Sequence, residues 1–333
     1  MANIVVSSDC GMECCYCFAR DELQAEQLEQ VERTPRFISI DHFEERLDFL
    51  DRSNIDEIRL IGGEPTLHPL FPELIRRARQ RDKHIVVFSH GLLSESALDC
   101  LASLPPDECT VLVNTSATRV RGGPTDEENA ARRETLSRLG PRALPGFTIV
   151  GVDFRLDHLL PLILETGCRK CLRLGLSQPS PSGLNSHLSP KLYPAVGRQI
   201  AAFSLEASKA RVKVSFDCGF VRCMFSDAEL AALRAAGADL DWRCNPVLDI
   251  DLTGQAIYCF PLAHRFRASI DGAADAGSLR AALIERARPY RLAGVYRECS
   301  SCSARRDGGC SGGCLAVTVR RFRTHELERA REC

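Results

Sequence analysis

Short apolar runs alternate with amphipathic segments through the first two thirds of the chain. The apolar runs are rich in Val, Ile and Leu, and their length and bounding turn residues are typical of buried strands. We expect strands at 3–8, 56–63, 84–91, 109–116, 147–152 and 171–176. A further strand is expected at 212–216.

The segments between these runs carry helical periodicity and capping signals. Residues 41–52 are expected to form a helix with Asp41 as its N-cap and Glu44 at the capping-box position. Thr125 and Glu128 make a second capping box at the start of a later helix. Further helices are expected at 71–80, from Ser94 onward, and at 193–209.

This alternation of strands and helices predicts an α/β fold with a parallel sheet and right-handed crossovers. Six such units form either a doubly wound sheet or an open barrel, and periodicity does not separate the two. The Pro- and Ser-rich stretch after residue 176 is expected to be a loop at the carboxyl edge of the sheet. Beyond it the sequence becomes rich in loops and cysteines, so we expect a barrel or sheet domain at 1–216, a bridging segment at 217–243 and a small cysteine-rich domain at 244–333.

Charge and hydropathy exclude two classes of partner. The 333 residues carry a formal net charge of −1, so no electrostatic footprint argues for nucleic acid. No window approaches the roughly 18 uncharged apolar residues of a membrane helix, and the first residues lack a basic leader followed by a long apolar run. We expect a cytoplasmic protein that binds neither nucleic acid nor a membrane.

Seventeen cysteines are unusual for a chain expected in a compartment that keeps thiols reduced. Secreted disulfide scaffolds are usually short and carry an export signal, and neither feature is expected here. Clustered cysteines are therefore expected to bind a metal or an iron–sulfur cluster. Isolated ones, such as Cys100 and Cys109, are expected to serve as small apolar side chains.

The first cluster of cysteines follows the first expected strand. Cys10, Cys14 and Cys17 have the spacing C-x3-C-x2-C, and Tyr16 precedes the last of them. Three thiolates on one loop can hold three corners of a four-iron cube and leave the fourth iron open for chemistry. A zinc knuckle built on two of these cysteines is the simpler alternative. A ligand set that uses Cys15 in place of Cys14 has poorer spacing, so Cys15 is not expected to be a ligand.

A glycine-rich turn follows the second expected strand. Gly62 and Gly63 allow the backbone to approach a ligand closely, and Glu64 and Pro65 fix the turn. Alone, this sequence is a generic connection between a strand and a loop. Its position one strand after the cysteine loop makes it specific.

Together, the cysteine loop and the GGEP turn resemble those of the radical S-adenosylmethionine (SAM) superfamily, over roughly residues 3–216. The resemblance implies a partial (β/α)6 TIM-like barrel with its site at the carboxyl ends of the strands. It also implies that Cys10, Cys14 and Cys17 ligate three irons of a [4Fe-4S] cluster, whose fourth iron is chelated by SAM.

The resemblance extends to residues that contact SAM. It implies that Tyr16 lies near the adenine, that the turn at 62–65 receives the amino group, and that Asn114 and Ser116 reach the ribose. Where many members have Thr-Asn-Gly after the third strand, this chain has Ser-His-Gly at 89–91.

A third group of cysteines occupies the C-terminal region. Its pattern is C-x9-G-x4-C, then C-x2-C-x7-C-x3-C, then a final cysteine, formed by Cys244, Gly254, Cys259, Cys299, Cys302, Cys310, Cys314 and Cys333. Thr253 and Gly254 are expected at the turn of a β-hairpin. Two zinc ribbons are the alternative to iron–sulfur clusters.

This pattern resembles the SPASM-type auxiliary domain of many radical SAM enzymes, with x7 where x5 is usual. The resemblance implies a first auxiliary cluster on Cys244, Cys259 and Cys314. It implies a second auxiliary cluster on Cys299, Cys302, Cys310 and Cys333.

Two cysteines remain between the barrel and this domain. Cys218 or Cys223 is expected to supply the missing fourth ligand of the first auxiliary cluster, or to donate a hydrogen atom to a substrate radical. A buried apolar role is the third alternative. We favour Cys223 as the functional residue, because it is nearer in sequence to Cys244.

The implied chemistry is reductive cleavage of SAM to a 5′-deoxyadenosyl radical, which abstracts a hydrogen from a substrate. The SPASM resemblance favours a peptide or protein substrate, modified by crosslinking, thioether formation, epimerisation or oxidation. The short segment before the first strand argues against an N-terminal peptide-recognition domain, so a small metabolite such as a sugar or aminocyclitol stays the alternative. A flavodoxin or ferredoxin is the expected external one-electron reductant, and a non-catalytic iron–sulfur or zinc scaffold is the rival of another class.

Overall fold

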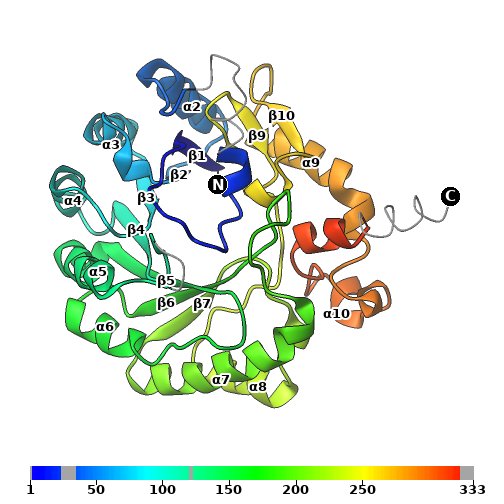
Figure 1. Cartoon of the computed structure of the whole chain (residues 1–333). Helices are drawn as coiled ribbons and strands as arrows, with labels where there is room; N and C mark the ends of the chain where they lie inside the picture. The colour runs from blue at the N-terminus through cyan, green and yellow to red at the C-terminus, as the bar shows by residue number, and fades with distance from the viewer. Residues whose placement is uncertain (1, 24–34, 120–122, 323–333) are drawn as a thin grey trace.

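A computed structural model describes residues 2–23, 35–119 and 123–322 of the chain. Seven parallel strands are paired in chain order around a central space, and the helices lie on the outside (Figure 1). The strands are β1 (Ala2–Ser7), β2 (Glu57–Gly62), β3 (His84–Ser89), β4 (Cys109–Asn114), β5 (Ala143–Ile149), β6 (Cys171–Leu176) and β7 (Lys213–Phe216). Helices on one side only distinguish an open barrel from a doubly wound sheet, which confirms the expected partial barrel.

The helices of the barrel follow the predicted periodicity. They are α2 (Ile40–Arg52), α3 (Phe71–Gln80), α4 (Glu95–Ala102), α5 (Asp126–Leu139), α6 (Leu159–Thr166), α7 (Tyr193–Lys209) and α8 (Asp227–Ala235). Ser94 caps α4 by accepting a hydrogen bond from the backbone N–H of Ala97. The capping box of Thr125 and Glu128 at the start of α5 is confirmed.

The predicted cap of α2 is wrong. Ser39, and not Asp41, is the N-cap, and its hydroxyl accepts from the backbone N–H of His42 over 3.1 Å. The capping-box position is therefore His42, and Glu44 lies two residues too far into the helix to close a capping box. Its carboxylate instead accepts hydrogen bonds from Arg77 (2.6 Å) and Arg81 (2.8 Å), which ties α2 to α3.

The C-terminal region continues the barrel sheet past β1. Its strands are β8 (Asp249–Ile250), β9 (Gln255–Ile257) and β10 (Arg267–Ser269), and the sheet order is β10-β9-β8-β1-β2-β3-β4-β5-β6-β7. β8 pairs with β1 in parallel and with β9 antiparallel. Gly254, with φ +87°, lies at the hairpin turn as expected. The sheet therefore crosses the expected domain boundary.

Shorter elements complete the C-terminal region. They are the 3-10 helices η4 (Arg222–Met224), η5 (Phe260–Leu262) and η6 (Arg297–Ser300), the helices α9 (Ala276–Arg291) and α10 (Ser303–Arg306), and a helical segment at 315–322. No helix in the described ranges is long and apolar enough to cross a membrane.

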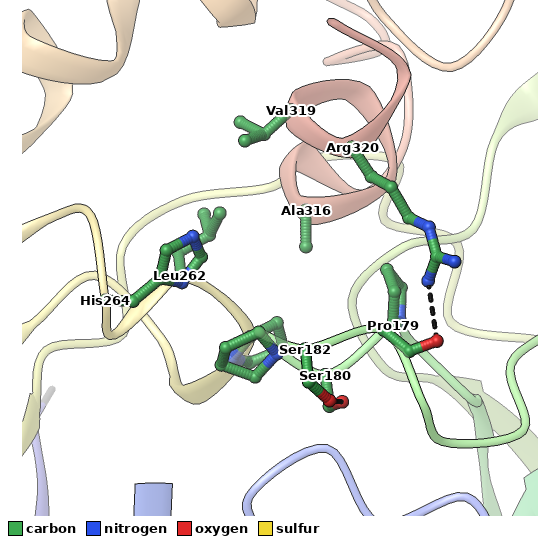
Figure 2. A pocket seen from close by; sticks show the side chains of 11 residues that line it. Pro179, Ser180, Ser182, Leu262, His264, Ala316, Val319 and Arg320 are labelled. Atoms are coloured by element: carbon green, nitrogen blue, oxygen red, sulfur yellow. Dashed lines mark hydrogen bonds between the residues drawn. The ribbon is translucent and has the colours of Figure 1, made fainter. Parts of the chain in front are cut away.

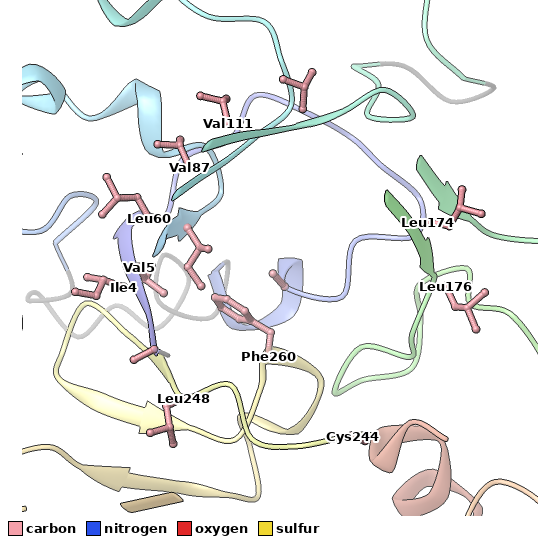
Figure 3. Packing of buried hydrophobic residues seen from close by; sticks show 14 of the residues in the cluster. Ile4, Val5, Leu60, Val87, Val111, Leu174, Leu176, Cys244, Leu248 and Phe260 are labelled. Carbon is pink, nitrogen blue, oxygen red and sulfur yellow. The ribbon is translucent and has the colours of Figure 1, made fainter. Parts of the chain in front are cut away.

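One apolar core joins the two regions. Side chains from successive barrel strands, such as Val5, Leu60 and Val87, are fully buried. Leu248 and Phe260 of the C-terminal region belong to the same cluster, which Figure 3 shows beside β1. Burial of this kind is worth about 25 cal/mol per Å² of apolar surface, so the C-terminal region is held to the barrel by packing as well as by strand pairing.

Candidate metal centre and surrounding loops

The loop after β1 gathers Cys10, Cys14 and Cys17. The backbone N–H of Cys17 donates to the carbonyl of Cys14 over 3.1 Å and closes a turn. Burial raises the pKa of the Cys10 thiol to about 12, and the charges of the other two thiols add to this rise. Burial also raises the pKa of the Cys17 thiol. A metal binds the thiolate form of cysteine, so it would displace the thiol protons on binding.

The structure separates the two adjacent cysteines of this loop. Cys14 is 9% exposed, and its sulfur accepts from the backbone N–H of Thr118 over 3.4 Å. Cys15 is exposed. The side chain of Cys14 therefore faces the barrel, as the spacing predicts for the middle ligand.

The glycines of the GGEP turn are required by a contact within the chain. A Cβ on Gly62 would lie 2.0 Å from the carbonyl oxygen of Ser7, and a Cβ on Gly63 would lie 2.2 Å from that of Asp9. The backbone N–H of Gly63 donates to Ser7 over 2.9 Å, and that of Glu64 donates to Asp9 over 2.6 Å. The turn therefore packs closely against the segment that precedes Cys10.

The buried carboxylate of Glu64 links this turn to the loop after β3. It is 0% exposed. Oε1 accepts from the hydroxyl of Thr66 over 2.7 Å, within the 3-10 helix η1 (Pro65–Leu67). Oε2 accepts from the backbone N–H of His90 over 2.8 Å and from the hydroxyl of Ser89 over 3.1 Å. Glu64 thus positions two loops at the carboxyl ends of the strands.

Tyr16, Asn114 and Ser116 form one hydrogen-bonded network. Asn114 donates from Nδ2 to the Tyr16 hydroxyl over 3.2 Å, and the Ser116 hydroxyl donates to Asn114 Oδ1 over 2.8 Å. Burial raises the pKa of Tyr16, so the phenol stays protonated. Hydrogen bonds therefore join the cysteine loop to the end of β4.

Arg132 on α5 is a site residue that the sequence reasoning missed. It is 1% exposed, and its guanidinium donates to the carbonyls of His90 (2.8 Å) and Ala117 (2.5 Å). Its third nitrogen, Nη1, has no hydrogen-bond partner among the described residues. Cys14 and Tyr16 of the cysteine loop are among the groups that act on the pKa of Arg132, so this cation lies near that loop. A buried, unpaired guanidinium N–H requires an acceptor, and a carboxylate suits it best.

The sequence carried one signal for Arg132. Glu128, Arg132 and Thr135 recur at helical spacing on the face of α5 that also carries the buried Leu136 and Leu139. A charged residue on the inner face of a helix is expensive unless it is paired. Such a position is a candidate for function even without a recognisable motif.

The C-terminal cysteines fall into two groups. Burial raises the pKa of Cys259 well above its usual value, and the nearby Cys314, Cys244 and Cys218 add to the rise. The backbone N–H of Gly312 donates to the sulfur of Cys310 in the second group. Cys299, Cys302 and Cys310 belong to that group. Burial raises the pKa of Cys223, and these three thiols add to the rise. Cys333 lies outside the described residues.

The cysteines of these loops are all potential thiolate ligands. Every described cysteine is a free thiol. Across the same residues, no three Cys, His, Asp or Glu side chains are arranged to hold one metal ion. Zinc, with Zn–S bonds of about 2.3 Å, draws its thiolates close together. A four-iron cluster binds each thiolate through a different iron and accepts a wider spacing.

A pocket of about 240 Å³ lies between the loop after β6, the η5 region and the helical segment 315–322. Figure 2 shows Leu262 and Val319 on its apolar side, and Arg320, whose guanidinium donates to the carbonyl of Gly183 over 3.0 Å. Ser180, Ser182 and His264 add polar groups to the lining. The volume suits a side chain or a small molecule rather than a large ligand.

The loop beside this pocket also covers the cysteine loop. Asn185 donates from Nδ2 to the carbonyl of Tyr16 over 3.0 Å, and the backbone N–H of Ser186 donates to that of Cys15 over 2.8 Å. The pocket is therefore connected to the metal loop through one segment of chain.

The chain is similar to several known proteins. The family model of the radical SAM superfamily matches residues 4–155. The mycofactocin maturase MftC of Mycobacterium ulcerans is 25% identical over 323 residues, covering 92% of this chain and 80% of that protein. The GTP 3',8-cyclase of Chlorobaculum tepidum is 32% identical over 116 residues, which are 34% of this chain and about a third, 32%, of the cyclase.

Solved structures share the whole fold. anSMEcpe with bound AdoMet aligns with a TM-score of 0.64 at 16% identity, covering 94% of this chain and 89% of that one. SuiB of Streptococcus suis, bound to the precursor peptide SuiA, aligns with a TM-score of 0.65 at 12% identity. The alignment covers 96% of this chain and 72% of SuiB. Residues 4–155, which carry the cysteine loop, therefore match the radical SAM superfamily, and the partial barrel continues into a C-terminal cysteine-rich region with the fold of these structures.

Proposed function

We propose that this enzyme modifies a peptide or protein by abstracting a hydrogen atom from it with a radical derived from SAM. The observation that carries the proposal is the match to MftC along nearly the whole chain, because that relative is named as a maturase. The fold shared with SuiB, which was solved with a precursor peptide, supports the same substrate class.

We infer that Cys10, Cys14 and Cys17 hold the cluster that binds SAM. When bound, this cluster with SAM supplies a 5′-deoxyadenosyl radical. The chain's own residues bind and orient: the turn at 62–65 accepts the SAM amino group, and Arg132 offers Nη1 to the SAM carboxylate. Tyr16, Asn114 and Ser116, which are joined by hydrogen bonds, would contact the adenosine.

The auxiliary cysteines extend the proposal to electron transfer. Cys244, Cys259 and Cys314 would hold one further cluster, and the group that contains Cys299 would hold another. Their role would be to accept the electron left on the substrate after hydrogen abstraction, which makes a net oxidation feasible. An external one-electron donor, such as a flavodoxin or ferredoxin, would reduce the SAM cluster.

The second candidate substrate is a small hydroxylated metabolite, such as a sugar or aminocyclitol. The pocket lined by Ser180, Ser182, His264 and Arg320 favours it, because these groups suit hydroxyl recognition in a volume of about 240 Å³.

The test begins with the reduced, iron-loaded protein and SAM, where 5′-deoxyadenosine distinguishes an enzyme from a scaffold. Candidate precursor peptides encoded beside the gene are then added, with sugar and aminocyclitol candidates in parallel. A peptide deuterated at the reacting carbon should transfer deuterium to 5′-deoxyadenosine and change mass. Transfer from a metabolite alone would overturn the peptide proposal.

A further inference from the structure

The inner face of the barrel carries an ion pair at β6 and β7. Leu172, Leu174 and Leu176 of β6 are buried, so the alternate residues of this strand face the central space. Figure 3 shows Leu174 and Leu176 on the side of β6 that is turned away from that space. Arg173 therefore faces inward, where its Nη2 lies 2.6 Å from Oδ1 of Asp217, the residue that follows β7.

A contact across the barrel shows the same direction. The guanidinium carbon of Arg173 lies 5.4 Å from the centre of the Phe88 ring, although β4 and β5 separate β3 from β6 in the sheet. Two strands so far apart in the sheet come into contact only across the central space. Phe88 directly precedes Ser89, whose hydroxyl donates to Glu64. The guanidinium thus lies beside the loop that the GGEP turn holds.

The strand register brings Arg173 close to the network of Tyr16. Arg173 is paired with Gly146 of β5, and Gly146 is paired with Asn114 of β4. Asn114 in turn donates to the Tyr16 hydroxyl over 3.2 Å. The ion pair therefore lies two strands, or about 10 Å along the sheet, from residues proposed to contact the adenosine. This is the end of the barrel at which such folds bind their substrates.

Two glycines leave the ion pair uncovered. A Cβ on Gly175 would lie 3.9 Å from Oδ2 of Asp217, so a side chain at this position would stand against the carboxylate. Neither Gly146 nor Gly175 has a positive φ, so the backbone does not require glycine at either position. The side chains of Arg173 and Asp217 are 25% and 38% exposed although they face the inside of the barrel. A ligand in the central space can therefore reach both.

The pair offers a donor and an acceptor in fixed positions. The ring of Phe88 packs on the guanidinium of Arg173, which restricts its orientation. Oδ1 of Asp217 accepts from the backbone N–H of Cys218 over 2.8 Å, which orients the carboxylate. A guanidinium has five N–H donors, and each carboxylate oxygen accepts more than one hydrogen bond. A main-chain amide, with one C=O acceptor and one N–H donor, matches this arrangement.

We propose that Arg173 and Asp217 bind a main-chain amide of the peptide substrate, next to the carbon that loses its hydrogen atom. Arg173 donates to the carbonyl oxygen of that amide, and Asp217 accepts from its N–H. The amide is thereby held about two strands from the adenosine, so that the reacting carbon faces it. The inference rests on the proposed function and adds the residues that would place the peptide in the barrel.

The ion pair of Arg59 and Glu57 in β2 provides a matched control. Nε of Arg59 lies 2.6 Å from Oε1 of Glu57, and the two side chains are 21% and 34% exposed. Both residues alternate with buried residues of the strand. Arg59 is paired with Val86, and Val86 with Thr110, four positions before Asn114. This pair has the same chemistry but lies nearer the amino ends of the strands.

Kinetics of the full, iron-loaded chain test the proposal. The probe is the precursor peptide, deuterated at the reacting carbon, that transfers deuterium in the test of the proposed function. Arg173→Gln should raise its KM about 10–100-fold and should lower the fraction of SAM cleavage events that transfer deuterium, because a hydrogen bond to a charged group is lost. Arg59→Gln should change neither quantity. An equal effect of the two variants would mean that Arg173 only supports the barrel.

A backbone ester gives a measurement that is independent of the stability of a variant. Esters replace, one at a time, the two amides nearest the reacting carbon, and each removes one N–H. In the parent, one of the two esters should raise KM about tenfold relative to the amide peptide. Asp217→Ala should act on that ester and on the amide peptide with similar KM, because the acceptor of the N–H is gone. If Asp217→Ala keeps the parent's preference for the amide, Asp217 does not bind it.

The proposed function and this inference fail differently. A parent that takes deuterium from no peptide contradicts the proposed function, and the inference falls with it. A parent that modifies a peptide, while Arg173→Gln and Asp217→Ala act on that peptide with the parent's KM and deuterium transfer, contradicts the inference alone.

Discussion

Asn3 donates a hydrogen bond from Nδ2 to Oδ1 of Asp249 over 2.6 Å, across 246 positions of sequence. The two residues are opposite each other in the pairing of β1 with β8. Asp249 is 4% exposed, and its Oδ2 accepts from the backbone N–H of Phe260 over 3.1 Å. A single carboxyl group therefore joins the first strand of the barrel to the β8–β9 hairpin, which is followed by Cys259.

This carboxyl group predicts a pH dependence of stability. Burial raises the pKa of Asp249 to about 7, against 3.8 for an ordinary aspartate. The folded protein thus keeps a proton that the unfolded chain releases, so the stability from this group is complete below pH 3.8 and is lost as the pH rises to about 7.

Asp249→Asn should remove that loss. We expect the free energy of unfolding to rise by up to about 4 kcal/mol at pH 8 and to change little near pH 4. The amide can donate to Oδ1 of Asn3, which has no partner in the described structure. Denaturant unfolding between pH 4 and pH 8 measures this change in the free energy of unfolding. A variant destabilised at pH 8 would mean that Asp249 is ionised in the folded protein.

The contrast between Cys14 and Cys15 predicts opposite effects of two neighbouring substitutions. Cys14→Ala should abolish 5′-deoxyadenosine formation, because it removes a buried thiolate that faces the barrel. Cys15→Ala should retain activity, because that side chain is exposed. Iron content and SAM cleavage of both variants are measured together, and the reverse result would identify Cys15 as the middle ligand.

Glu64→Gln tests whether the buried carboxylate holds the two loops in place. The amide must turn a donor toward Thr66 or toward Ser89 and His90, all of which now donate to Glu64. We expect a loss of roughly 2–4 kcal/mol in the free energy of unfolding and weaker SAM binding. The control is Glu95→Gln on α4, since the side chain of Glu95 is 77% exposed and pairs only, among the described residues, with the half-buried Arg138. Equal stability of the two variants would rule out this role for Glu64.

Local signals in the sequence predicted most of the barrel, because strand periodicity and caps depend on neighbouring residues. The capping box at Thr125 formed as expected. β8 was not predicted as a strand of the barrel sheet, because it is only two residues long and joins the sheet by pairing with β1. The cap of α2 was misplaced because Ser39 and Asp41 are both good caps, and local sequence does not choose between them.

In the candidate site, too, some features follow from local sequence and others depend on how distant segments pack together. Cys10, Cys14 and Cys17 were evident because their spacing along one loop carries the geometry. Glu64 was recognised as part of a turn, but its contact with His90 depends on how β2 and β3 are aligned. The close approach of Gly219 to Cys314 likewise depends on the path of the chain after β7.

Arg132 gives the last prediction. If Nη1 binds the carboxylate of SAM, the parent enzyme should bind SAM about 10–100-fold more tightly than the carboxamide analogue of SAM, since a charge-assisted hydrogen bond is worth about 1.5–3 kcal/mol. Arg132→Gln should prefer SAM by a smaller factor than the parent does, because only chelation of the iron by SAM would still distinguish the two compounds. The neighbouring Arg133→Gln, which removes an exposed ion pair with Glu165, should discriminate as the parent does.

Comparing two ligands within each variant separates recognition from folding. Arg132 also donates to the carbonyls of His90 and Ala117, so Arg132→Gln is expected to be less stable and to bind every ligand more weakly. A general weakening leaves the ratio between SAM and its carboxamide unchanged, whereas loss of a carboxylate contact brings that ratio toward one. Anaerobic equilibrium binding to iron-loaded protein measures the ratio. If Arg132→Gln still prefers the carboxylate by the parent's factor, Arg132 acts only through the two loops that it holds.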